Sequence, residues 1–243
     1  ILNKLNINIG KKKFDNLKFI GCGSSFLPLS KQIEFINKYK IKVANLYGLS
    51  ETGPTHIDDP RRKNWKPGTI GKPLSVCKFK LDKKNNILIK GNNVFNGYYK
   101  NKKLFKESFV NKKWFITGDI GKKEKGNIFF LDRSKDLIIK NGINIVPGEI
   151  EEAIYKSKKI LECCVVGIED DIQGEEIAVA IKPNNSNIRF NLLVDFVKKQ
   201  CKQSLSNYKV PKYFYLLNNF PKTASGKIKR RIIKKKLNLV YNK

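Results

Sequence analysis

The chain has 243 residues, of which 40% are hydrophobic, so it can bury one large core or two smaller ones, and a fully disordered protein is excluded. Its formal net charge is +29, which would suit nucleic acid or an anionic membrane. Only six of the fifty cations are arginine and the lysines run along the whole chain, so a compositional bias explains the charge better and no nucleic-acid partner is expected.

The first predicted unit covers residues 1–131 and begins as an α/β structure. An apolar run at 17–21 predicts a strand, and the apolar spacing over 29–40 predicts a helix. The β-rich run at 41–47 predicts a second strand. Together these segments predict one strand–helix–strand unit.

The second half of this unit has a different pattern. Short strand candidates at 76–81, 86–91 and 127–132 alternate with turns rich in Asn, Gly and Lys. Such spacing is typical of a small antiparallel β subdomain.

A polar stretch at 132–136 predicts a hinge, and residues 137–243 predict a compact α+β unit of ordinary domain size. Helices are expected from Pro147, at 190–201 and from about Lys227. Strands are expected at 136–140, 142–146, 161–168, 176–183 and 212–217.

Cysteine usage and hydropathy predict a cytoplasmic protein. The five cysteines form no CxxC pair and no metal-ligand spacing with His56, which predicts reduced structural thiols. No apolar run approaches the roughly 20 residues that cross a bilayer, so any membrane contact is expected to be peripheral, at the inner face. The chain begins with Ile and contains no Met, and we expect it to be a fragment of a longer polypeptide.

Candidate ligand-binding side chains follow the predicted strand at 41–47. Tyr47, Ser50 and Glu51 offer a ring, a hydroxyl and a carboxylate within five positions. At the carboxyl end of a strand such a set can stack a base, bond a phosphate and hold Mg²⁺. A hydrophilic turn that begins a loop is the alternative interpretation.

Two further clusters carry similar chemistry. Asp119 is expected to follow a tight turn directly after a strand, where it could accept hydrogen bonds from two ribose hydroxyls. Arg133 could bridge ribose or phosphate, and Gly142 would let a ligand pass close to the backbone. An ordinary turn and a solvated linker are the alternatives.

Lys227 ends a glycine-containing loop at the predicted start of the last helix. A lysine there can bring a point charge to a phosphoryl group. The segment is not a Walker loop, because Ile228 follows the lysine and Pro221 stands where that motif has glycine. A lysine-rich C-terminal helix is the alternative.

The order and spacing of these clusters resemble the adenylate-forming superfamily of acyl-CoA synthetases, luciferases and nonribosomal adenylation domains. The resemblance runs from about Leu17 to Lys235 through eight blocks, which include NLYGLSETGP, WFITGDIG and PKTASGKIKRR. The blocks DRSKDLIIKNGINIVPGEIE and YKVPKY are most similar to bacterial medium- and long-chain fatty acyl-CoA synthetases. The resemblance implies the C-terminal portion of such an enzyme: the tail of the large adenylation domain, then a mobile α+β lid.

The resemblance also implies residue roles in binding ATP. Tyr47 would lie against the adenine, and Asp119 would hold the ribose hydroxyls. Ser50, where the family usually has Thr, would meet the α-phosphate, and Glu51 would coordinate Mg²⁺. The other nucleotide-binding positions that it implies are Gly23, Ser24, Ser25, Gly48 and Arg133.

Three positions are implied to serve a two-step reaction. Lys227 would catalyse formation of acyl-AMP from a carboxylic acid, expected to be a fatty acid, and ATP. The lid would then turn about Lys135, and the thiol of coenzyme A would reach the adenylate past Gly142.

Two alternatives to a CoA ligase stay open. One is a ligase that loads the phosphopantetheine of a carrier protein. The other is a truncated, non-catalytic remnant, since the family's Ser/Thr/Gly-rich phosphate loop does not occur in these 243 residues. For that reason the chain is expected to be inactive alone.

Overall fold

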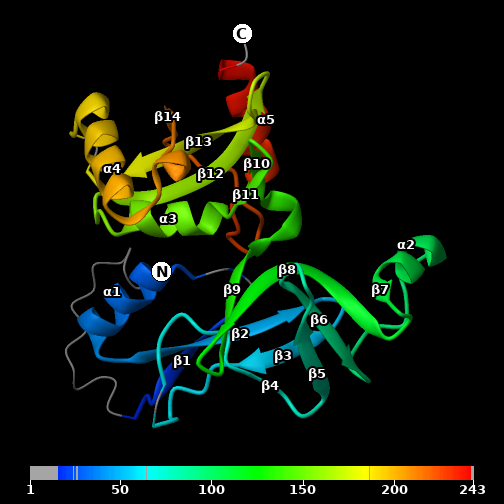
Figure 1. Ribbon diagram of the computed structural model, residues 1–243. Coiled ribbons are helices and arrows are strands. Elements are labelled where there is room, and N and C mark those ends of the chain that lie inside the picture. Colours follow the sequence, from blue (N-terminus) through cyan, green and yellow to red (C-terminus); the bar gives the residue numbers. More distant parts are fainter. Residues whose placement is uncertain (1–15, 24, 26, 64, 186, 242–243) are drawn as a thin grey trace. The chain divides into compact units, whose positions relative to one another are not determined.

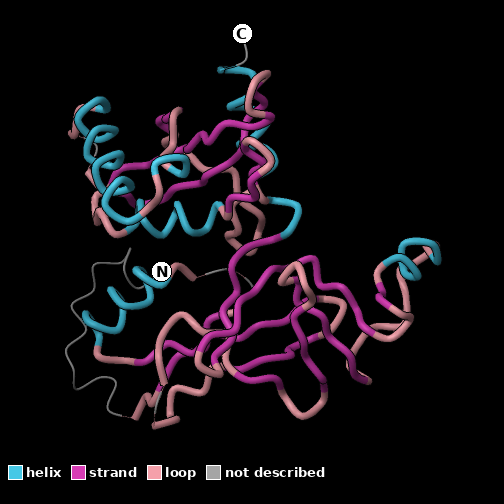
Figure 2. The backbone as a smooth tube through the Cα atoms, in the orientation of Figure 1, coloured by secondary structure: helices cyan, strands magenta, loops and turns pink. Residues whose placement is uncertain are grey.

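The computed structural model describes residues 16–23, 25, 27–63, 65–185 and 187–241 (Figure 1). Contacts divide the chain into two compact units, and the boundary lies between Phe130 and Leu131. Figure 2 distinguishes the helices, strands and loops of both units.

The first unit begins with the predicted strand–helix–strand arrangement. Its elements are β1 (Phe19–Cys22), α1 (Leu29–Tyr39) and β2 (Lys42–Leu49). The two strands pair in parallel, so the prediction is confirmed. Gln32 is fully buried on α1 and donates to the Val43 carbonyl at 2.8 Å, which fastens the helix to β2.

Two strands that the sequence pattern did not predict extend this sheet. They are β3 (Gly53–Ile57) and β4 (Lys72–Pro73), and the sheet order is β1-β2-β3-β4 with antiparallel pairing after β2. β3 begins with Gly and Pro, residues that ordinarily mark a turn, and β4 has only two residues. Neither strand carries an alternating pattern long enough to detect.

A second sheet completes the first unit and confirms the predicted antiparallel subdomain. Its strands have the order β5-β6-β8-β7, and β9 pairs with β8. The elements are β5 (Cys77–Leu81), β6 (Asn86–Gly91), α2 (Lys102–Glu107), β7 (Phe109–Val110), β8 (Trp114–Glu124) and β9 (Asn127–Arg133).

Asp119 lies inside the long strand β8, so the prediction that it follows a turn after a strand is wrong. Asn86 pairs with Ile120 while Leu88 pairs with Ile116, so β8 uses four positions where β6 uses two. Extra residues in one strand make a bulge, which keeps the pairing but redirects a side chain. The glycine before Asp119 therefore belongs to a bulge.

The second unit is built on one mixed sheet. Its strand order is β11-β10-β13-β12, with β14 parallel to β13. The strands are β10 (Ile138–Lys140), β11 (Ile143–Ile145), β12 (Ile160–Asp170), β13 (Gly174–Pro183) and β14 (Tyr213–Leu216). The helices are α3 (Pro147–Tyr155), α4 (Phe190–Ser204) and α5 (Arg230–Tyr241), with short turns η2 (Ser134–Asp136) and η3 (Asn207–Lys209).

Helices cover both faces of this sheet (Figure 1). Val165 and Val179 belong to the core that α3 and α4 cover, whereas Val166 and Ala180 belong to the core that α5 covers. A strand buried on both faces needs apolar residues at successive positions. This requirement explains the nearly continuous apolar runs of β12 and β13.

The predicted hinge segment is structured. β9 extends to Arg133, and η2 follows it with Lys135 exposed. Asp132 is buried, and its carboxylate accepts the Gly148 amide at 2.9 Å, next to Pro147 at the start of α3. Asp132 is therefore part of the packing of the second unit. A pivot at Lys135 stays a prediction.

Candidate functional site

The turn that joins β2 to β3 carries Ser50 and Glu51. Thr52 is buried beneath it: its Oγ1 accepts the Leu49 amide at 3.2 Å and donates to the Gly53 carbonyl at 3.0 Å. Ser50 is exposed at the tip of this turn. The backbone is thus fixed from within while the Ser50 hydroxyl remains accessible.

A loop after β6 holds Glu51. The Tyr98 hydroxyl donates to Oε1 of Glu51 at 3.1 Å. Two hydrogen bonds to backbone carbonyls hold the β2–β3 turn. The Phe95 amide donates to the Glu51 carbonyl, and the Asn93 side-chain amide donates to the Thr52 carbonyl, each at 2.8 Å. Burial raises the pKa of Tyr98, and the charge of Glu51 raises it further, so the hydroxyl keeps its proton and donates it.

Tyr98 was missed by the sequence interpretation. Its segment belongs to one of the blocks that carry the resemblance, but it received no role. A tyrosine 47 positions from the carboxylate that it contacts gives no local signal. The structure brings them together through the loop that follows β6.

Tyr47 and Asp119, 72 positions apart, meet between the two sheets of the first unit. The Tyr47 hydroxyl donates to Oδ2 of Asp119 at 2.9 Å, and Asp119 is only 2% exposed. Thr117 accepts the Asp119 amide at 3.1 Å and donates to the Ile87 carbonyl at 2.8 Å. This arrangement ties β2 to β8, and contact of Asp119 with a ribose stays a prediction.

His56 belongs to the core beside Tyr47. It is fully buried on β3, and its ring centroid lies 5.5 Å from that of Tyr47 and 5.0 Å from that of Phe79. Its Nδ1 lies 3.0 Å from the Thr55 hydroxyl. Burial lowers the pKa of His56 to about 4, so the ring is neutral at neutral pH.

The other predicted positions of the first unit have simpler surroundings. Gly23 and Ser25 are exposed after β1, and Ser24 lies outside the described residues. A Cβ at Gly48 would lie 2.2 Å from the Gly53 carbonyl oxygen. The close approach of β3 therefore requires glycine at position 48, with or without a nucleotide.

Lys227 lies on a closed turn, so its predicted place at the start of a helix is wrong. Lys222 and Ile228 pair as an antiparallel bridge. Within it the Thr223 amide donates to the Lys227 carbonyl at 2.8 Å, and the Lys227 amide donates to Thr223 Oγ1 at 3.1 Å. These bonds occupy backbone groups that a helix would use, so α5 begins only at Arg230. The side chain of Lys227 is exposed.

Gly142 lies at the tip of the hairpin between β10 and β11. It and Asn141 both have positive φ angles, 73° and 50°. A two-residue hairpin turn of this type favours Asn-Gly, because glycine adopts such angles without steric cost. The turn itself thus accounts for the glycine, and a role in CoA passage stays a prediction.

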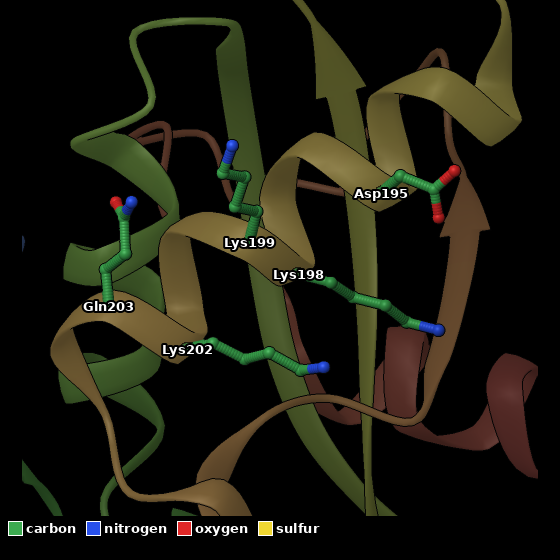
Figure 3. Close-up of a pocket in the computed structure, with 5 residues that line it drawn as sticks. All are labelled: Asp195, Lys198, Lys199, Lys202 and Gln203. Atoms are coloured by element: carbon green, nitrogen blue, oxygen red, sulfur yellow. The ribbon is translucent and has the colours of Figure 1, made fainter.

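Two further features bear on ligand binding. No group of three or more His, Cys, Asp or Glu side chains suited to a metal ion occurs within the described ranges. A shallow depression of about 420 Å³ runs along α4, lined by Asp195, Lys198, Lys199, Lys202 and Gln203 (Figure 3). Lys198 and Lys202 extend to one side and Lys199 to another, so this is an open basic surface that contains none of the predicted site residues.

The hydropathy of the described helices and the state of the cysteines bear on the predicted location of the protein. None of these helices combines the length and the apolar character that a membrane crossing needs. All five cysteines are present as free thiols, four of them buried. Burial raises the pKa of Cys164 to about 12, so this thiol stays protonated. Cytoplasmic location and peripheral membrane contact stay predictions.

Comparison with known proteins finds CoA ligases among the relatives of this chain. The chain is 35% identical over 212 residues to the 2-succinylbenzoate–CoA ligase of Listeria monocytogenes, covering 86% of this chain and 44% of the relative. It is 34% identical to the long-chain-fatty-acid–CoA ligase of Bacillus subtilis, covering 89% and 40%. The chain therefore spans less than half the length of these relatives.

A solved structure agrees with these matches. The o-succinylbenzoate CoA synthetase of Bacillus subtilis in complex with an acyl-adenylate intermediate has a TM-score of 0.77 and 30% identity, covering 90% of this chain and 46% of that one. The same enzyme has been solved with ATP and a magnesium ion.

Family models match both units. The model of the AMP-binding enzyme matches residues 1–99, and the model of the AMP-binding enzyme C-terminal domain matches residues 149–227. Relatives, solved structures and models agree with the resemblance that the sequence blocks carry. The chain belongs to the family of AMP-binding, adenylate-forming enzymes and includes its C-terminal domain.

Proposed function

We propose that the whole protein is an acid–CoA ligase, which converts a carboxylic acid and ATP into acyl-AMP and pyrophosphate and then transfers the acyl group to coenzyme A. The observation that carries this proposal is the β2–β3 turn. It offers an accessible hydroxyl, Ser50, beside a carboxylate, Glu51, that Tyr98 holds in place. Membership of a family whose relatives include CoA ligases supports the same reaction.

The residues of the first unit would bind the nucleotide. Ser50 would donate its hydroxyl to the α-phosphate, and the turn beneath it would need no rearrangement because Thr52 already fixes it. Tyr47 would lie against the adenine, and Asp119 would accept the ribose hydroxyls.

Glu51 fits a magnesium ion of the kind that accompanies ATP. Mg²⁺ is usually bound through one or two carboxylates together with substrate phosphates and water, rather than by a cage of protein ligands. Glu51 supplies one carboxylate, oriented through Oε1 by Tyr98. When bound, the metal would neutralise phosphate charge.

The second unit would supply the mobile catalytic group and the path for the thiol. The substrate carboxylate oxygen attacks the α-phosphorus, pyrophosphate leaves, and the exposed Lys227 ammonium stabilises charge on the transferring group. The unit then turns about Lys135, with Arg133 assisting at the ribose before it does. In the second step the thiol sulfur attacks the acyl carbon past Gly142, AMP leaves, and the thiol proton passes to solvent.

The acid is proposed to be hydrophobic. The relatives named above act, by their names, on 2-succinylbenzoate or on long-chain fatty acids. 2-Succinylbenzoate carries an aromatic ring and two carboxylates, and a fatty acid carries an aliphatic chain and one carboxylate, so both belong in a substrate panel. Coenzyme A and a phosphopantetheinyl carrier protein would be compared as acceptors.

ATP–pyrophosphate exchange by the full-length gene product tests the proposal. We expect exchange with at least one acid of the panel, and Lys227→Ala should reduce it about 100-fold or more, because it removes a charge contact to the transition state. Lys235→Ala, an exposed lysine on α5, is the matched control and should leave exchange unchanged. The proposal is wrong if no acid supports exchange, and the role of Lys227 is wrong if its removal has no effect.

A further inference from the structure

Arg230, the first residue of α5, is the centre of an ion cluster inside the second unit. Its Nη1 donates to Oε1 of Glu151 at 2.8 Å and also to the Val165 carbonyl. Its Nε lies 3.9 Å from Oδ2 of Asp136. The Arg230 side chain is 22% exposed, and that of Glu151 is 10% exposed. The cluster therefore joins four elements: α5, α3, β12 and η2.

The cluster depends on the guanidinium fork. Glu151 also accepts the Val165 amide at 2.8 Å, so Arg230 and Glu151 together satisfy both backbone groups of Val165. Burial raises the pKa of Glu151, and the Arg230 cation opposes that rise. Nη1 donates to the carboxylate and the carbonyl while Nε lies near Asp136, and the single ammonium nitrogen of a lysine cannot occupy both of these places at once.

The cluster lies at one end of the turn that bears Lys227. At the other end Lys222 forms an ion pair with Glu162 of β12. Close to Arg230, the Lys229 amide donates to the Pro221 carbonyl at 2.8 Å and closes the base of the turn. The turn is therefore anchored at both ends, and Arg230 supplies the only anchor in this set that also reaches η2, through Asp136.

We propose that Arg230 is a positioning residue for Lys227. It fixes turn 222–228 to α3, β12 and η2, so that the turn and Lys227 move together with these elements as one rigid body when the unit turns about Lys135. The inference rests on the proposed function. Arg230 itself is not assigned any contact with substrate. Its effect on the reaction passes through the place that it gives to the Lys227 ammonium.

The kinetic test compares Arg230→Lys with Arg231→Lys, a neighbouring arginine that is exposed. Arg230→Lys should lower the kcat of ATP–pyrophosphate exchange about 10- to 100-fold, since a displacement of about 1 Å can cost that much, with little change in the KM for ATP. Arg231→Lys should have no effect. Wild-type-like exchange by Arg230→Lys would overturn the proposal.

Two further measurements separate positioning from general damage. In a Lys227→Ala background, Arg230→Lys should lower exchange no further, because both changes remove the same contact. Thioester formation from supplied acyl-AMP should be retained, since Lys227 is not used in that step. The proposal would be overturned if the losses of exchange in Lys227→Ala and Arg230→Lys multiplied in the double variant. It would also be overturned if Arg230→Lys slowed pyrophosphate exchange and thioester formation equally.

Hydrogen exchange tests the same inference without catalysis. In Arg230→Lys the amides of Thr223, Lys227 and Lys229 should exchange faster, while that of Val179 in the sheet core keeps its protection. Unchanged protection in the turn would overturn the proposal. If the wild-type protein exchanges pyrophosphate with no acid, the proposed function fails, and hydrogen exchange still decides whether Arg230 holds the turn.

Discussion

Protonation of His56 should lower the stability of the first unit as the pH falls. The side chain is fully buried on β3 between the rings of Tyr47 and Phe79. Its Nε2 is buried and has no hydrogen-bond partner among the described residues. An imidazolium there would lose its hydration without gaining an acceptor at that nitrogen, and this is why the pKa is lowered to about 4.

Proton linkage gives the sign and the size of this change in the free energy of unfolding. The folded state binds the proton less readily than the unfolded state, whose histidine has a pKa of about 6.5. The stability that neutral His56 contributes is therefore fully present above about pH 7, and it is lost as the pH falls from about 6.5 towards about 4. With these two pKa values, the free energy of unfolding decreases by about 2 kcal/mol between pH 7 and pH 5, and by about 3 kcal/mol in the limit.

The chain has a single histidine, so the assay is direct. Its 243 residues, produced without a histidine tag and with labelled histidine, should give one imidazole signal in NMR, titrating near pH 4 in the folded state. Urea unfolding at pH 7 and pH 5 gives the free-energy change. His56→Gln removes the titration and should flatten the pH dependence by about 2 kcal/mol. An imidazole that titrates near pH 6.5 in folded protein would refute the reasoning.

Two other predictions concern magnesium and the hinge. Tyr98→Phe should raise the Mg²⁺ concentration needed for half-maximal exchange about tenfold, because Glu51 loses the hydroxyl that orients it. Tyr99→Phe, at a residue that is 88% exposed, should leave that concentration unchanged. Equal Mg²⁺ curves for Tyr98→Phe and the wild-type protein would contradict the assignment. Lys135→Pro should stiffen η2, sparing pyrophosphate exchange but slowing thioester formation, and parallel loss of both rates would exclude a pivot there.

Local patterns were sufficient for much of the fold. A short apolar run predicted β1 and a β-rich run predicted β2. Continuous apolar runs predicted β12 and β13, because a strand that is buried on both faces needs apolar residues at successive positions. Pro147 predicted the start of α3, since proline suits the first turn of a helix. The spacing of the motif blocks also predicted the family, which the comparisons confirm.

The same patterns failed where backbone pairing overrides composition. Asp119 was expected after a strand, and only pairing with β6 reveals that β8 continues through a bulge. Lys227 was expected at the start of the last helix because the segment that follows it is rich in lysine and arginine. Hydrogen bonds between Thr223 and Lys227 close a turn instead.

From the sequence by itself came the family, the two units and the residue types available for chemistry. Only the tertiary structure decided which side chains hold those residues: Tyr98 on Glu51, Tyr47 on Asp119, and Arg230 on Glu151, 79 positions apart. Each pair is brought together by the packing of separate elements. Periodicity describes which face of an element is buried, but the partner across that face depends on register and on the path of the loops between them.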